Sequence, residues 1–354
     1  VKDSLQSLSL HLDVHKEDTS FGVATYFREY LRGFLRNWVK ENPKPNGDAY
    51  DIFRDGLKVY VTLDSRMQNY AEEAMQEHMS NLQRVFFKQQ KEHNRTAPFY
   101  DLTKKEIDRT MLSAMKRSNR WKRSKKAGKS EEEIRASFET KTEMTVFSWK
   151  GEIDTIMTPL DSIRYYKHFL QTGVLSVEPQ TGHVKAWVGG INYKHFQYDH
   201  VKQGSRQVGS TFKPFVYATA INQLQLSPCE EFTNTPYTIP QGKYGLPEDW
   251  TPKNSTDDYG GELTLKEALA GSVNVVTAKL IDMVHPKNVV SLAQRAGITS
   301  EIPEVPAIAL GSVDLSLFEM VGAYATFANK GLRVEPMMIL KIEDKNGTVL
   351  QQFT

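Results

Sequence analysis

The 354-residue sequence is poor in cysteine and lacks long apolar runs. Its one cysteine, Cys229, excludes an internal disulfide and leaves the redox compartment open. No run of eighteen apolar residues occurs, so we expect no membrane-spanning helix within this sequence. The net charge of +2 argues against a dedicated nucleic-acid-binding protein. Position 1 is Val rather than Met and no signal peptide follows, which indicates an excerpt or a processed chain whose anchor or targeting segment would lie upstream.

The composition, 39% hydrophobic and 25% charged, is that of an ordinary soluble globular protein, and the length is sufficient for two domains. Alternation and helical spacing predict strands at 57–63, 144–149, 174–177, 184–188, 338–343 and 348–353, and helices at 21–39, 66–90, 160–170, 214–221, 264–271, 275–284 and 316–331. Between them, residues 227–262 are expected to form a long irregular loop, a kind of segment that is more often functional than idle.

A segment that is expected to be helical and is strongly basic covers residues 116–129. We interpret it as a solvated or mobile hairpin, because charge runs are usually solvated. Contact with an anionic envelope polymer is the alternative.

The stretch from Arg206 to Pro214 places a serine and a lysine three residues apart at an expected helix start. The ring of Pro214 would clash with the carbonyl four residues earlier in a helix, so Ser210 must lie at or before the first turn. A lysine desolvated among apolar neighbours can take the proton that keeps a serine hydroxyl from acting as a nucleophile. Ser210 and Lys213 are therefore the candidate nucleophile and general base. The spacing alone is weak evidence, because it recurs at Ser113 and Lys116 in a charged helical stretch.

A second candidate motif, Ser272-Val273-Asn274, lies 62 residues after Ser210 in an expected bend between two helices. The Ser272 hydroxyl could relay a proton to a leaving amine, and the Asn274 carboxamide could hold a substrate amide. On its own this tripeptide is also compatible with a simple helix cap.

In order and type, these features resemble the transpeptidase domain of class A penicillin-binding proteins, the bifunctional peptidoglycan synthases. The resemblance covers about residues 173–343 and rests on Glu178 to Gly182, Gly189-Gly190, Arg206 to Pro214, Leu263 to Asn274, Ala309-Leu310-Gly311 and Tyr324 to Ala328. It implies three parts: a segment 1–56 that follows an upstream glycosyltransferase domain, a mainly helical linker region 57–172, and a C-terminally incomplete transpeptidase domain 173–354.

The resemblance implies an α+β serine acyltransferase fold, in which an antiparallel sheet is flanked by helices and an all-helical subdomain. It also implies that Ser210 is acylated, that Lys213 is its base, and that Ser272 and Asn274 serve proton relay and substrate binding. The implied reaction cleaves a terminal D-alanyl-D-alanine bond and passes the acyl group to an amine, without a metal or cofactor. Its implied partners are peptidoglycan stem peptides, the lipid-linked precursor, β-lactams and envelope-synthesis proteins, at the external face of the cytoplasmic membrane.

Two features of that family are not found in the sequence. The third motif, Lys-Thr-Gly or Lys-Ser-Gly, is absent, because Lys126-Ala127-Gly128 precedes Ser210 and Lys345-Asn346-Gly347 lacks the hydroxyl. The glycosyltransferase motifs are also absent from residues 1–56. We therefore expect that domain upstream and the third motif downstream.

Two alternatives remain open from the sequence. A carboxypeptidase or β-lactamase would share the serine and lysine but give the acyl group to water, and no deacylating acid is recognisable here. A β-lactam sensor or structural pseudoenzyme would bind without turnover.

Overall fold

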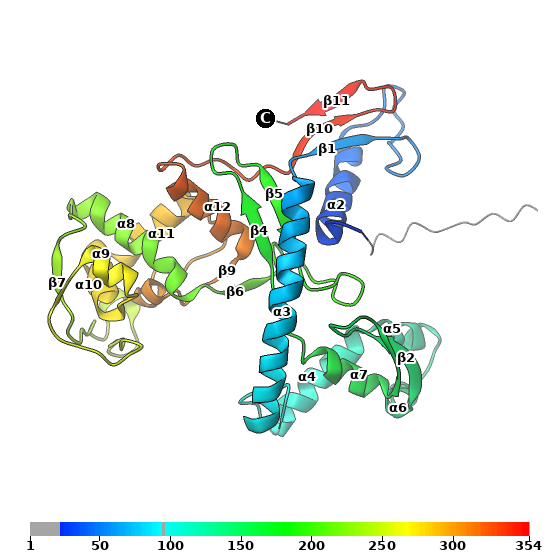
Figure 1. Ribbon diagram of the computed structural model, residues 1–354, viewed down its shortest axis with the longest axis horizontal. Coiled ribbons are helices and arrows are strands. Elements are labelled where there is room, and N and C mark those ends of the chain that lie inside the picture. Colours follow the sequence, from blue (N-terminus) through cyan, green and yellow to red (C-terminus); the bar gives the residue numbers. More distant parts are fainter. Residues whose placement is uncertain (1–21, 94–95, 354) are drawn as a thin grey trace, which may run out of the picture.

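The computed structural model describes residues 22–93 and 96–353, which form helices and short strands around a long central helix (Figure 1). The helices are α2 (Thr25–Glu41), α3 (Ser65–His93), α4 (Lys104–Arg117), α5 (Asn119–Lys126), α6 (Glu131–Glu139), α7 (Pro159–Tyr166), α8 (Lys213–Leu224), α9 (Leu265–Ala270), α10 (Asn274–Val284), α11 (Pro286–Arg295) and α12 (Leu317–Ala328), with 3-10 turns η1 (Gly209–Phe212), η2 (Lys243–Gly245) and η3 (Pro306–Leu310). The strands are β1 (Lys58–Val61), β2 (Thr142–Val146), β3 (Ile153–Met157), β4 (Val174–Val177), β5 (Val184–Val188), β6 (Ser205–Gln207), β7 (Glu231–Thr233), β8 (Glu262–Thr264), β9 (Asp314–Ser316), β10 (Ile339–Glu343) and β11 (Val349–Gln352).

Most of the expected elements are present, with some differences. The helix expected from Phe21 begins at Thr25, and Phe21 itself lies outside the described residues. The helix expected to stop at Gly331 already ends at Ala328. The stretch 227–262 is not wholly irregular, because β7 pairs with β8 across it.

The basic segment 116–129 is helical, as expected, and consists of the end of α4, the helix α5 and the turn that follows it. Ser118 ends α4, and its side chain then caps α5 by accepting a hydrogen bond from the Trp121 amide. Trp121 is buried with Met115, Ile134 and Phe138. The buried Trp121 thus anchors α5, whose other side chains are mostly basic.

Helix α3 connects the parts of the molecule (Figure 1). Its first half packs along β5, and helices α4 to α7 gather at its far end. The buried Gln68 side chain accepts a hydrogen bond from the Trp187 amide and donates one to the Trp187 carbonyl, at 2.7 and 2.9 Å. Its carboxamide thereby acts like a neighbouring strand and holds α3 to β5.

All ladders between named strands in the described residues are antiparallel. Strand β1 pairs with β10, which pairs with β11 through the turn containing Asn346-Gly347, as the hairpin signal predicts. The pairing sets Lys58 opposite Glu343. Strands β4 and β5 form a separate hairpin.

The largest hydrophobic core lies among α8 to α12 and η3. Residues 213–220 of α8 are buried or half-buried and 221–224 are exposed. Helix α8 packs on α10, and both helices are apolar over most of their length. This helical region and the antiparallel strands confirm the α+β class expected from the sequence. Of the described helices, none combines the length and apolar character needed to cross a bilayer.

Candidate active site

Ser210 lies in the 3-10 turn η1, directly before α8, and its side chain is exposed. Lys213 is the first residue of α8, followed by Pro214, and its side chain is 1% exposed. The proline therefore occupies the one turn of the helix that tolerates it. The chain thus sets a solvent-facing hydroxyl and a buried amine one turn apart.

The Lys213 amine contacts the second candidate motif. Its Nζ donates to the Ser272 carbonyl at 2.5 Å, to the Ser272 hydroxyl at 3.0 Å and to Asn274 Oδ1 at 2.7 Å. These contacts account for all three donors of an ammonium group. The structure therefore brings Lys213, Ser272 and Asn274 together, whereas within the described part of the chain Lys213 makes no hydrogen bond to Ser210.

Burial lowers the pKa of Lys213 from its ordinary 10.5 to about 8. At pH 7 about 9% of such an amine is neutral, against about 0.03% at the ordinary pKa. Removal of water from a cation among apolar neighbours is the cause. The amine can therefore accept a proton at a pH where an exposed lysine hardly does.

Ser272 adopts a left-handed backbone conformation, with φ 53°. It stands one residue beyond the cap of α9, where its amide bonds to Leu269 O and the Val273 amide to Ala268 O. This double hydrogen bond is the Schellman ending of a helix, and its left-handed position is usually glycine. A serine here costs backbone strain, which is a signal for a role of the hydroxyl. Residue type alone did not predict this conformation.

The backbone before Ser210 lies against Gly311. The Gly209 amide donates to Gly311 O at 3.1 Å, and the Val208 amide donates to Val313 O at 3.0 Å. A Cβ on Gly311, whose φ is 72°, would stand 1.9 Å from Gly209 O. Only glycine fits this contact. The Ala309-Leu310-Gly311 segment, noted in the sequence only as part of a resemblance, thus supports the turn that carries Ser210.

Tyr324 of α12 supports the same turn, a role that sequence reasoning did not indicate. Its hydroxyl donates to Thr211 O at 2.7 Å. Tyr324 and Thr211 also line a cavity of about 510 Å³ together with Val208, Leu315 and Met320. A largely apolar hollow therefore borders the candidate nucleophile.

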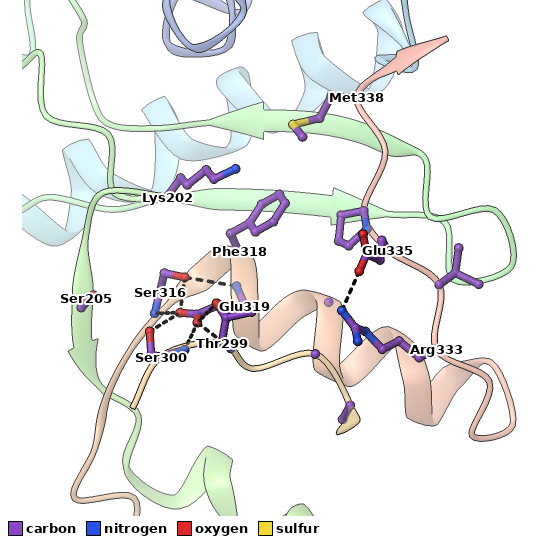
Figure 2. Close-up of a pocket in the computed structure, with 15 residues that line it drawn as sticks. Lys202, Ser205, Thr299, Ser300, Ser316, Phe318, Glu319, Arg333, Glu335 and Met338 are labelled. Carbon is purple, nitrogen blue, oxygen red and sulfur yellow. Dashed lines mark hydrogen bonds and ion pairs between the residues drawn. The ribbon is translucent and has the colours of Figure 1, made fainter. Parts of the chain in front are cut away.

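A second cavity, of about 520 Å³, contains the most heavily hydrogen-bonded carboxylate of this region (Figure 2). Glu319 accepts hydrogen bonds from the backbone and hydroxyl groups of Thr299, Ser300 and Ser316. These bonds outweigh burial and lower its pKa to about 2. With its oxygens saturated, Glu319 ties the 299–300 loop to the start of α12 and is not available as a proton acceptor.

The other Ser-x-x-Lys pair lies on the exposed surface of α4. The Ser113 hydroxyl accepts a hydrogen bond from the Arg117 guanidinium, and Lys116 Nζ lies 3.6 Å from Glu131 Oε1. The burial that distinguishes Lys213 is therefore lacking at Lys116. In residues 22–93 and 96–353, no three His, Cys, Asp or Glu side chains gather in a way that could hold a metal ion.

Comparison with known proteins assigns the family. The penicillin-binding protein transpeptidase domain matches residues 172–353, and the penicillin-binding protein middle domain matches residues 94–170. The transpeptidase match covers more than half of the chain, so the chain belongs to the penicillin-binding proteins and contains their transpeptidase domain.

The similar proteins are also named as penicillin-binding proteins. Penicillin-binding protein 1A of Aquifex aeolicus is 27% identical over 352 residues, which are 95% of this chain and 44% of that protein. Penicillin-binding protein 1A of Rickettsia felis is 36% identical over 177 residues, 50% of this chain and 22% of that protein. The crystal structure of penicillin-binding protein 1A from Haemophilus influenzae superposes with a TM-score of 0.61 at 23% identity, over 94% of this chain and 50% of that one. The chain thus spans less than half the length of these two curated relatives.

Proposed function

We propose that residues 173–354 belong to a peptidoglycan D,D-transpeptidase that works through a serine acyl-enzyme. The observation that carries the proposal is the buried Lys213 amine, one turn from the exposed Ser210 and hydrogen-bonded to both polar side chains of the second motif. Family membership supports the reaction class.

In the proposed first step, the Ser210 oxygen attacks the carbonyl carbon of the penultimate D-alanine of a stem peptide. The neutral Lys213 amine takes the hydroxyl proton as the carbon–oxygen bond forms. Among the described residues, Lys213 hydrogen-bonds to the second motif and not to Ser210, so its hydrogen bond with Ser210 has to form when substrate binds, as is common in catalysis.

In the next step, the peptide carbon–nitrogen bond breaks and the leaving amine of D-alanine needs a proton. Ser272 Oγ, 3.0 Å from Lys213 Nζ, is suited to pass that proton on, and the hydroxyl takes a replacement from the Lys213 ammonium. One N–H of Asn274 donates to Lys253 O, so the other remains for a substrate carbonyl. An acceptor amine then attacks the ester, and its proton returns to Ser210 by the same route.

The proposal extends to the whole protein. By resemblance we expect an upstream membrane anchor and glycosyltransferase domain, with 57–172 as the linker between the activities. The substrates would be stem peptides and the lipid-linked precursor at the external face of the cytoplasmic membrane. β-Lactams would act as covalent inhibitors.

The test is incubation of the full-length protein with a labelled penicillin, followed by peptide mapping. We expect one label, on Ser210, that is lost in Ser210→Ala and kept in Ser113→Ala. A label on Ser113, or labelling that survives Ser210→Ala, would reject the assignment. A D-alanyl-D-alanine peptide offered together with an amine acceptor then separates transfer from hydrolysis, since only transfer makes a cross-linked product.

A further inference from the structure

The N-terminus of α10, where Asn274 stands, has no cap of its own. The residue at the cap position is Val273, whose side chain has no acceptor. The first amide groups of the helix must therefore find an acceptor elsewhere. Since the helix begins with the side chain that contacts Lys213, the group that satisfies these amides also determines where Asn274 lies.

That acceptor comes from a residue twenty positions earlier in the chain. Asn254 Oδ1 accepts hydrogen bonds from the Asn274 amide at 3.0 Å and from the Val275 amide at 3.2 Å. The neighbouring Lys253 carbonyl accepts one from Asn274 Nδ2 at 2.7 Å. The pair Lys253-Asn254 thus holds both the backbone and the side chain of Asn274, which leaves Asn274 Oδ1 directed at Lys213.

Asn254 is itself held in a single orientation. It is 7% exposed, and its Nδ2 donates to Asn234 Oδ1 at 2.8 Å and to Asp258 O at 3.0 Å. Together with the two amides that it accepts from, all four hydrogen-bonding positions of the carboxamide are filled. A flipped amide would turn N–H groups toward the N–H groups of α10. Asn234, also 7% exposed, donates its own Nδ2 to Asp258 O and closes the network.

We infer that Asn254 is a positioning residue for acyl transfer, acting through Asn274 on Lys213. This inference rests on the proposed function. It assigns a role to the loop 227–262, which the sequence marked only by its length. In this role the loop places the second motif against the buried amine, and Asn254 does not itself touch the reacting atoms.

The chain offers a matched control at the other end of the same helix. Asn288 Nδ2 donates to Val284 O at 2.8 Å, at the C-terminus of α10, and within the described residues Asn288 makes no hydrogen bond to Lys213, Ser272 or Asn274. Asn254→Ala and Asn288→Ala each remove one asparagine that satisfies the backbone at an end of α10. Only the first change releases Asn274.

The experiment measures penicillin acylation against pH in the full-length protein, together with the melting temperature of each variant. For Asn254→Ala we expect acylation at pH 7 to be at least tenfold slower. We also expect the acid limb of the pH–rate profile, its rising part at low pH, to move to higher pH, because a loosened Asn274 admits water to Lys213 and so raises its pKa. Asn288→Ala should stay within about twofold of the parent rate with an unchanged profile, and the two melting temperatures show how much of any difference in rate follows from lost stability. If Asn254→Ala and Asn288→Ala slow acylation equally and neither shifts the pH–rate profile, Asn254 has only a structural role and the inference is wrong.

Asn254→Asp is a second variant, which keeps the acceptor for the Asn274 and Val275 amides at the helix N-terminus, where negative charge is favourable. Its other oxygen faces Asn234 Oδ1 and Asp258 O, so its melting temperature is measured beside its rate. The added charge near the Lys213 ammonium should move the acid limb to higher pH while the rate at high pH stays close to that of the parent. An unmoved limb in Asn254→Asp would contradict the inference. If the parent protein takes no label at all, the proposed function fails, and this inference fails with it.

Discussion

Replacement of Lys213 by methionine tests the burial of this amine without relying on catalysis. Methionine keeps an unbranched side chain of similar length and removes the charge. In the folded protein burial lowers the pKa of Lys213 to about 8, whereas an unfolded chain has the ordinary 10.5. The difference, at about 1.4 kcal/mol per pH unit, is about 3 kcal/mol. No discount for solvent screening applies, because the side chain is 1% exposed.

The sign of the effect follows from proton binding. Between pH 8 and 10.5 the unfolded chain binds more protons at this lysine than the folded protein does, so the free energy of unfolding rises with pH. Below pH 7 both states are protonated and the penalty is constant. From pH 7 to pH 9.5 the parent should gain about 2 kcal/mol relative to Lys213→Met. Any change in the Lys213 hydrogen bonds on deprotonation is already part of the folded-state pKa, and the remainder of their loss in the variant is the same at both pH values.

Calorimetry of the full-length protein at the two pH values measures this gain. The transition of the transpeptidase domain is the one that bound penicillin raises in the parent. We expect the melting temperature of the parent to gain about 4 to 8 °C on that of Lys213→Met between pH 7 and 9.5. Lys116→Met, at the exposed lysine of the other Ser-x-x-Lys pair, should give no such change. If the difference in melting temperature between the parent and Lys213→Met is the same at pH 7 and at pH 9.5, the argument for a buried amine is refuted.

Three further outcomes are expected. Acylation by penicillin should quicken about tenfold per pH unit up to about pH 8 and then level off, because the neutral fraction of Lys213 does so, and a flat profile would contradict Lys213 as base. Ser272→Gly should change the free energy of unfolding by no more than about 1 kcal/mol, because relief of the left-handed backbone offsets the lost hydrogen bond from Lys213, while acylation falls at least tenfold. Thermal melting and penicillin kinetics check this, and an unchanged acylation rate would remove Ser272 from the mechanism. Gly311→Ala should lower the free energy of unfolding by about 2 kcal/mol or more and slow acylation, because the added methyl meets Gly209 O. Thermal melting and penicillin kinetics check this, and parent-like values of both would show that the methyl is tolerated.

The candidate site was only partly predictable from the sequence. The proline after Lys213 located Ser210 at a helix start. The capping box of Thr264 and Glu267 located the start of α9, and Gly271 located its end, just before Ser272. These signals act within one turn of chain, where propensity and capping dominate. The acceptor from Asn254 could not be found in this way, because an asparagine in a loop has no local feature that names a helix twenty residues later as its partner.

By itself the sequence determined the local elements: which serine precedes a helix, which helix contains an uninterrupted apolar run, and where Asn346-Gly347 turns a hairpin. Only the tertiary structure decided which of the two Ser-x-x-Lys pairs contains a desolvated lysine amine. Lys213 and Lys116 have the same relation to a serine, but Lys213 alone is carried into the core, by the packing of α8 on α10. That packing also brings Lys213 to Asn274, 61 residues away. Desolvation depends on everything that surrounds a group in three dimensions, so no short motif contains it.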